Sequence, residues 1–76
     1  MNKQRREALE KLRDTIEDLK GEVETLRDEE QEYYDNMPEG LKGGEKGSFA
    51  EEAISNMEEA LSGLEDVQSS IENAAE

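Results

Sequence analysis

The chain has 76 residues, of which 22 are acidic and nine are basic, and its formal net charge is −13 at pH 7. This charge disfavours direct binding to nucleic acid or to an anionic membrane, because both partners require a cationic surface. The chain lacks His and Cys, which excludes a histidine base, a Ser-His-Asp triad, a thiol nucleophile and a disulfide.

Residues 3–36 show the apolar spacing of a coiled-coil helix, with steps of three and four residues. With Leu9 at heptad position a, the a positions hold Leu9, Ile16, Val23, Glu30 and Met37, and the d positions hold Leu12, Leu19, Leu26 and Tyr33. The e positions hold Arg6, Arg13, Lys20 and Arg27, followed by Tyr34. A basic flank is common in coiled coils, and it also suits an acidic stripe on a partner helix.

Residues 37–47 have the composition of a loop. Pro38 disfavours helical geometry at Met37, and four of the six glycines lie in this segment. Ser48 and Glu51 then form a capping box, which predicts a second helix over residues 48–75.

The predicted second helix consists of four seven-residue repeats, SFAEEAI, SNMEEAL, SGLEDVQ and SSIENAA. Seven residues make about two helical turns, so each position of the repeat forms a stripe along the helix. With Ala50 at position a, the a, d and e stripes are mostly apolar and form a face wider than a coiled-coil seam. The b and c stripes are acidic, and residues 48–75 include no Lys or Arg.

Folding the chain back at residues 37–47 aligns the basic stripe of the first helix with the b stripe of the second. The aligned pairs are Arg13 with Glu72, Lys20 with Glu65 and Arg27 with Glu58. The same register predicts core layers of Leu12 with Ile71, Leu19 with Leu64, Leu26 with Met57 and Tyr33 with Ala50. The predicted fold is therefore all-α, a single domain formed by an antiparallel two-helix hairpin.

The apolar face of the second helix is wider than the first helix can cover, so we expect two hairpins to pair as a homodimeric four-helix bundle. A parallel two-stranded coiled coil through the first helix is the alternative, since Ile16 and Val23 at a with Leu at d suit that arrangement. The candidate self-association residues are Leu12, Ile16, Leu19, Val23, Leu26, Ile54, Met57, Leu61, Leu64 and Ile71.

No motif in the chain indicates an enzyme, a cofactor site or a metal site. The glycines of residues 40–47 lack the P-loop spacing, and the run DEEQEYYD lacks the EF-hand spacing. Glu30 in the a stripe is expected to lie beside Ala53 and reach water, since a bundle metal site would need Glu-x-x-His companions. No apolar run is long enough to span a membrane and no secretory signal follows Met1, so we expect a cytoplasmic protein.

Exposed acidic and aromatic residues are the candidates for binding a protein partner with a basic surface. They are Asp28, Glu29, Glu32, Tyr34, Asp35, Glu52, Glu59 and Asp66. Such charges are also typical of an ordinary solvated helix face. At the predicted hairpin tip, a cluster either closes the loop or contacts a protein; it comprises Tyr33, Tyr34, Met37, Leu41 and Phe49.

The density of negative charge limits any mimicry of nucleic acid. The acidic residues of the second helix lie about 5 Å apart along its axis, as judged from the rise per residue. Duplex DNA carries one charge per about 1.7 Å of its axis. A nucleic-acid mimic would therefore require self-association of the chain.

The segments DEEQEYYDNMPEGLKGGEKG and AEEAISNMEEALSGLEDVQSSIENA resemble short acidic hairpin proteins encoded by phages and prophages, over about residues 25–75. The resemblance implies a small phage accessory protein of the host cytoplasm, and it implies no catalytic residues. We therefore predict an inhibitor that binds a host or anti-phage defence complex by occupying a basic, nucleic-acid-binding surface. The alternative is a non-inhibitory structural or assembly module whose apolar helix face docks a partner helix.

Overall fold

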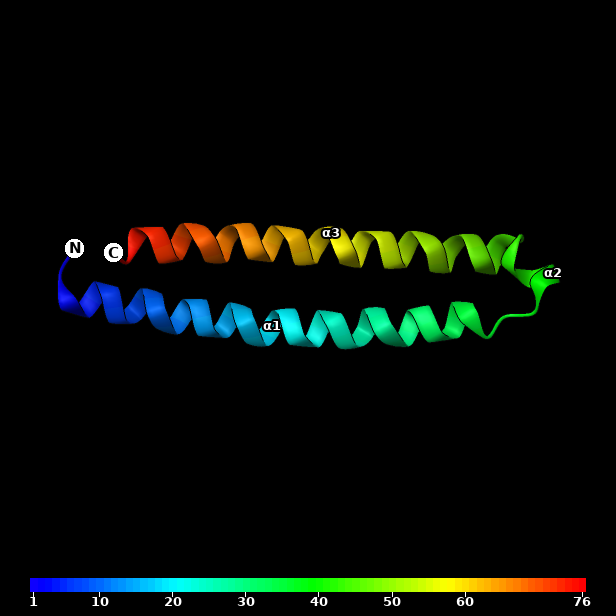
Figure 1. The fold of residues 1–76 in the computed structure, drawn as a ribbon, viewed down its shortest axis with the longest axis horizontal. Helices are drawn as coiled ribbons and strands as arrows, with labels where there is room; N and C mark the ends of the chain where they lie inside the picture. The colour runs from blue at the N-terminus through cyan, green and yellow to red at the C-terminus, as the bar shows by residue number, and fades with distance from the viewer.

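The computed structural model describes all of residues 1–76 and shows an elongated, all-helical chain of 59 × 15 × 12 Å (Figure 1). Two long helices, α1 (Lys3–Asp35) and α3 (Glu45–Ala74), lie side by side and run in opposite directions. The one-turn helix α2 (Glu39–Lys42) lies where they join, which we call the turn end, and both termini lie at the other, terminal end. The predicted all-α class is confirmed, and the arrangement of the helices is hairpin-like.

Local sequence signals set both ends of α1. At its start, the Asn2 side-chain oxygen accepts a hydrogen bond of 2.8 Å from the Arg5 backbone N–H, as an N-cap residue does. At its end, Met37 N–H donates to the Tyr34 carbonyl at 3.1 Å, and Pro38 follows with no N–H to continue the helix. The helix ends at Asp35, one residue before the predicted end.

The predicted loop at residues 37–47 is largely helical. The Pro38 carbonyl accepts hydrogen bonds from the N–H groups of Leu41 and Lys42 at 2.9 and 3.2 Å, which closes the single turn of α2. Helix α3 then begins at Glu45, so Ser48 lies inside it and is not the N-cap residue that the capping box predicted. Gly44 occupies the N-cap position without a side-chain hydrogen bond.

A close approach at Gly47 explains why the chain turns so tightly. A side chain added at Gly47 would overlap the Lys42 backbone, with its Cβ 2.7 Å from the Lys42 Cα. The glycine therefore allows the first turn of α3 to pack directly on α2. With this packing, α3 begins at Glu45, three residues before the start that the capping box at Ser48 predicted.

The core of the single chain is small and lies mostly toward the turn end. The buried residues are Met37, Gly47, Ala50, Ile54 and Leu61. Helix α1 contributes none of them, and its inward side chains Leu9, Ile16 and Val23 are only half-buried. The hydrophobic burial that holds α1 against α3 is therefore incomplete in the terminal half of the rod.

The predicted core layers that used the d positions of α1 are wrong. Leu12, Leu19, Leu26 and Tyr33 are 53%, 43%, 56% and 50% exposed. The two helices meet along their a and e positions, and a d side chain points about 80° away from that line of contact. These four residues therefore lie on the flank of the hairpin-like chain instead of opposite Ile71, Leu64, Met57 and Ala50.

Candidate protein-binding faces

The arrangement of the helices gives the rod two different long faces. When antiparallel helices meet along a and e, their b positions share one face and their d positions share the opposite face. Over residues 9–33 of α1 and 50–74 of α3, the heptad pattern places uncharged residues at d and, apart from Gln31, charged residues at b. We call these the acidic face and the apolar face.

The acidic face carries two rows of glutamates with aspartates beside them. All of its carboxylates are exposed, and they are Glu10, Glu17, Glu24, Glu51, Glu58, Glu65 and Glu72, flanked by Asp14, Asp28 and Asp35. The α1 row was not among the predicted partner-binding residues. Its signal in the sequence is the Glu at every seventh residue from Glu10 to Glu24.

Four basic side chains lie in the seam between the helices, on the side of the acidic face. Arg6, Arg13, Lys20 and Arg27 are all half-buried, because their aliphatic stems cover the apolar contact while their charged ends reach the surface. The Lys20 side chain is only 14% exposed, and its Nζ lies 3.6 Å from both Glu17 and Glu65. Arg6 Nε donates to the Ala75 carbonyl at 3.0 Å, which joins the first and last turns of the rod.

Only one of the three predicted ion pairs between the helices forms. Lys20 with Glu65 is confirmed, but Arg13 and Arg27 instead pair with the next residue in their own helix, Asp14 at 3.2 Å and Asp28 at 3.1 Å. The predicted pairs of Arg13 with Glu72 and Arg27 with Glu58 are wrong. Exposed ion pairs differ little in free energy, about 0–1 kcal/mol each, so the nearer aspartate is sufficient to redirect the guanidinium group.

Gln68 links the helices at the centre of this face, in an e stripe that is otherwise apolar. Its side-chain N–H group donates to Glu17 at 2.8 Å and to the Arg13 carbonyl at 3.3 Å, and its oxygen accepts from Lys20 at 3.2 Å. The hydrogen bond from Gln68, followed by the charge of Lys20, lowers the pKa of the Glu17 carboxyl group. This network fixes the register of α1 against α3, and its sequence signal is the single polar residue in the row Ile54, Leu61, Gln68, Ala75.

Tyr34 has a similar role at the turn end. Its hydroxyl group donates a short hydrogen bond to Glu51, and the Lys42 Nζ lies 5.4 Å from the centre of its ring. The hydrogen bond to Glu51 raises the pKa of the Tyr34 hydroxyl group, and burial adds to the effect. Tyr34 thus connects α1, α2 and α3, whereas its neighbour Tyr33 lies on the apolar face.

The two halves of the apolar face differ in the size of their side chains, which are large on α1 and mostly small on α3. Its α1 half is formed by the residues that we call the Leu/Tyr row, Leu12, Leu19, Leu26 and Tyr33. Its α3 half is formed by the d and g residues from Ala53 onward, which we call the small-residue track: Ala53, Asn56, Ala60, Gly63, Val67, Ser70 and Ala74. The g residue before them is Phe49, which is exposed at the turn end. No residue of the track is charged, and Val67 is 49% exposed.

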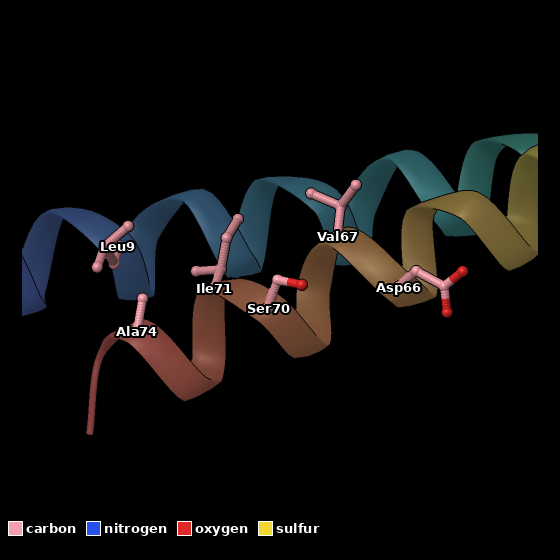
Figure 2. Close-up of a pocket in the computed structure, with 6 residues that line it drawn as sticks. All are labelled: Leu9, Asp66, Val67, Ser70, Ile71 and Ala74. Carbon is pink, nitrogen blue, oxygen red and sulfur yellow. The ribbon is translucent and has the colours of Figure 1, made fainter.

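Three separate shallow grooves lie along or beside the apolar face. At the terminal end, Leu9 on α1 and five residues of α3 line a groove of about 350 Å³; the five are Asp66, Val67, Ser70, Ile71 and Ala74 (Figure 2). A second groove lies beside Leu26, and a third of about 370 Å³ lies at the turn end. The third groove contains the predicted tip residues Tyr33, Met37 and Leu41.

The structure spreads the predicted partner-binding residues around the rod. Asp28 and Asp35 border the acidic face, and Glu29 borders the apolar face. The others are Glu32 on the outer edge of α1, Glu52 and Glu59 on the outer edge of α3, Asp66 between that edge and the terminal groove, and the half-buried Tyr34 in the seam.

The predicted self-association residues fall into two groups. Leu12, Leu19 and Leu26 are exposed on the apolar face. The rest lie between α1 and α3 and are buried or half-buried: Ile16, Val23, Ile54, Met57, Leu61, Leu64 and Ile71. Within the single chain, the second group is already used to hold the two helices together.

No family model matches this chain, and no curated protein or solved structure matches it either. The resemblance to phage-encoded acidic proteins therefore stays a prediction. No helix in the structure combines the length and apolar character that crossing a membrane requires. No group of three or more acidic side chains is arranged to hold a metal ion.

Proposed function

We propose that this chain is a non-enzymatic, cytoplasmic protein that binds a basic protein surface through its acidic face. As a phage-type protein, it inhibits a host or anti-phage defence complex by occupying a surface that otherwise binds nucleic acid. The observation that supports this function is the acidic face itself, with ten exposed carboxylates along one side of the rod. The nearby cations are half-buried in the seam, so carboxylates form the outermost layer of this face.

The charge density of the acidic face suits an electrostatic partner. Its carboxylates span about 38 Å of helical rise, which gives roughly one charge per 4 Å. We propose that the chain acts as a pair in a four-helix bundle, which would carry twice the charge of one chain, −26. Pairing through the apolar faces would leave one acidic face on each side of the bundle, toward a partner.

A matched pair of triple variants tests this function. Glu24→Gln, Glu58→Gln and Glu72→Gln remove three charges from the acidic face, and none of these residues is in an ion pair. Glu52→Gln, Glu59→Gln and Asp66→Asn remove three charges from the outer edge of α3 and serve as the control. The probe is a fluorescent lysine- and arginine-rich peptide, followed by fluorescence anisotropy.

We expect the acidic-face variant to bind the peptide at least about tenfold more weakly, while the outer-edge variant loses less than about threefold. Binding of the unmodified chain should disappear near 1 M salt, where the Debye length is about 3 Å. Equal losses in the two variants would show that only net charge matters, and binding that persists at high salt would contradict the electrostatic mechanism.

The exposed Leu/Tyr row favours a second function, a structural or assembly module that docks a partner helix. In that case both triple variants would keep their partner, because the contact is apolar. Substitutions in the Leu/Tyr row would abolish binding instead.

A further inference from the structure

The apolar face is too extensive for an isolated small protein. The chain buries only four apolar side chains and leaves the four residues of the Leu/Tyr row about half exposed. Chains of this length are marginal with one small core, and they commonly gain burial by oligomerisation. We therefore expect another protein surface to bury this face, and the chemistry of its two halves indicates which surface fits.

We infer that a second copy of this chain covers the apolar face, with the Leu/Tyr row of each copy seated on the small-residue track of the other. The inference deepens the pairing proposed above, but it does not depend on what the acidic face binds. The assembly has its two-fold axis along the rod, so α1 of one copy lies antiparallel to α3 of the other and all four termini lie at one end. Large side chains then meet small ones along both contacts, which keeps the spacing between the helices uniform.

The register already present within the chain aligns the two copies. Lys20 and Glu65 are level with each other along the rod, as are Tyr34 and Glu51. Rotation about a two-fold axis parallel to the rod does not shift the second copy along it. Residues that are level within one chain are therefore also level between the two chains. The layers between the copies are then Leu12 with Ala74, Leu19 with Val67, Leu26 with Ala60 and Tyr33 with Ala53.

Charge also favours this arrangement. The carboxylates beside the Leu/Tyr row in the middle of the rod are Glu22 and Glu29, at the g positions of α1, and the half-buried Glu30 in the a stripe. In the inferred pair, Glu22 lies beside Gly63 of the other copy and Glu29 lies beside Asn56. Neither glutamate is level with a charged residue of the small-residue track, and an asparagine amide can donate to a carboxylate.

The size of the rod allows a stable pair. Its whole long side measures 59 × 15 Å, so each copy can offer at most about 900 Å² to the other. Stable interfaces bury roughly 1,200–2,000 Å² in total, counting both partners. A second copy also brings its own acidic face to the outside, so pairing does not place the two acidic faces against each other.

Two glycines provide a charge-matched test. Gly63 lies in the small-residue track and Gly21 lies on the acidic side of α1, and a Cβ at either position meets nothing within 4 Å in the single chain. Both are in the interior of long helices, so Gly63→Glu and Gly21→Glu gain similar helix propensity and add the same charge. The difference that matters for pairing is whether a second copy would lie over the new side chain.

The measurement is sedimentation equilibrium with light scattering over a range of protein concentrations. We expect the unmodified chain and Gly21→Glu to form a dimer of twice 8.6 kDa, and Gly63→Glu to dissociate at least about tenfold more readily. Circular dichroism checks that all three remain helical. A strict monomer at high concentration, or equal association of the two variants, would overturn the inference.

Cysteine crosslinking tests the orientation of the copies, because the chain has no cysteine of its own. A tagged Leu19→Cys chain is mixed with an untagged Val67→Cys chain, refolded and oxidised. We expect the mixed disulfide to form in preference to either homodisulfide. Preferential joining of two Leu19→Cys chains would overturn the arrangement of the row on the track.

These results are separable from those of the proposed function. Gly63→Glu keeps the whole acidic face, so it should still bind the lysine- and arginine-rich peptide. Loss of pairing with retained peptide binding supports both proposals. A dimer that binds no basic peptide would contradict the proposed function and leave the inferred pairing intact.

Discussion

The two ends of the rod are built differently although the same two helices form both. At the turn end, Met37, Ala50 and Ile54 are buried, and Gly47 packs against the α2 backbone. At the terminal end, Leu9 and Ile71 are half-buried and line an open groove. Heptad repetition alone therefore does not distribute burial evenly along a hairpin-like pair of helices.

The difference comes from what fills the seam between the helices. Toward the turn, α3 supplies Ile54 and Leu61 at its e positions, and the chain reversal adds the side chain of Met37. Beyond Leu61, the e position holds Gln68, which exchanges apolar contact for a polar network with Glu17 and Lys20. Most of the buried apolar side chains are therefore at the turn end, whereas the hydrogen bonds that align α1 with α3 are at the centre.

The largest expected effect comes from breaking the turn end at Gly47. Gly47→Ala places a Cβ against the Lys42 backbone, so α2 and α3 must separate. We expect a loss of about 4 kcal/mol or more in the free energy of unfolding, as for other severe backbone clashes. Denaturant unfolding measures it, and Gly40→Ala, where nothing lies within 4 Å of the added Cβ, should have little effect.

Two isoleucines at opposite ends compare the two regions directly. Ile54 is buried and Ile71 is half-buried. We expect Ile54→Ala to lower the free energy of unfolding by about 3 kcal/mol and Ile71→Ala by about 1 kcal/mol, since the cost follows the burial that is lost. Both are measured in the Gly63→Glu background, to keep the copies separate. Equal costs would contradict the graded core.

Glu30 offers a way to strengthen the seam. It is half-buried in the a stripe between Val23 and Met37, and it forms no side-chain hydrogen bond or ion pair in the structure. Glu30→Leu should raise the free energy of unfolding by about 1 kcal/mol through added apolar burial. Thermal unfolding checks this, and Glu32→Leu, on the exposed outer edge, should leave the midpoint nearly unchanged.

The smallest expected effect is electrostatic and concerns Glu17. The pKa of its carboxyl group is lowered in the folded chain, chiefly by Gln68 and then by Lys20. The stabilisation is therefore complete above the ordinary pKa of about 4.3, and it is lost as the pH falls through the lowered value. Gln68→Met should return the pKa of Glu17 toward its ordinary value in an NMR titration, whereas Gln31→Met should not.

Periodicity and turn residues were sufficient to predict the helical class and the two long helices. The seven-residue spacing of Leu9, Ile16 and Val23 survives in the structure as the inward stripe of α1. Pro38 ended α1 close to where it was expected to. These features depend on local geometry, which the sequence determines directly.

Features that depend on how each helix is rotated about its own axis, or on contacts between segments, were not predicted. A seam assigned to a and d instead lies along a and e, and this rotation exposes Leu12, Leu19 and Leu26. The start of α3 was misplaced because Gly47 acts through a contact with Lys42, which no local pattern encodes. Arg13 and Arg27 were misassigned because several carboxylates compete for each guanidinium group at nearly equal free energy.

The two adjacent tyrosines make the turn end separately observable, because the chain has no tryptophan. The Tyr34 hydroxyl group is bonded to Glu51 whereas Tyr33 is exposed, so the phenol absorbance changes when α1 and α3 part at that end. Far-ultraviolet ellipticity instead averages over both long helices. If the terminal half frays first, ellipticity will fall at a lower temperature than the phenol signal shifts, and two ordinary optical signals will resolve the order in which this rod opens.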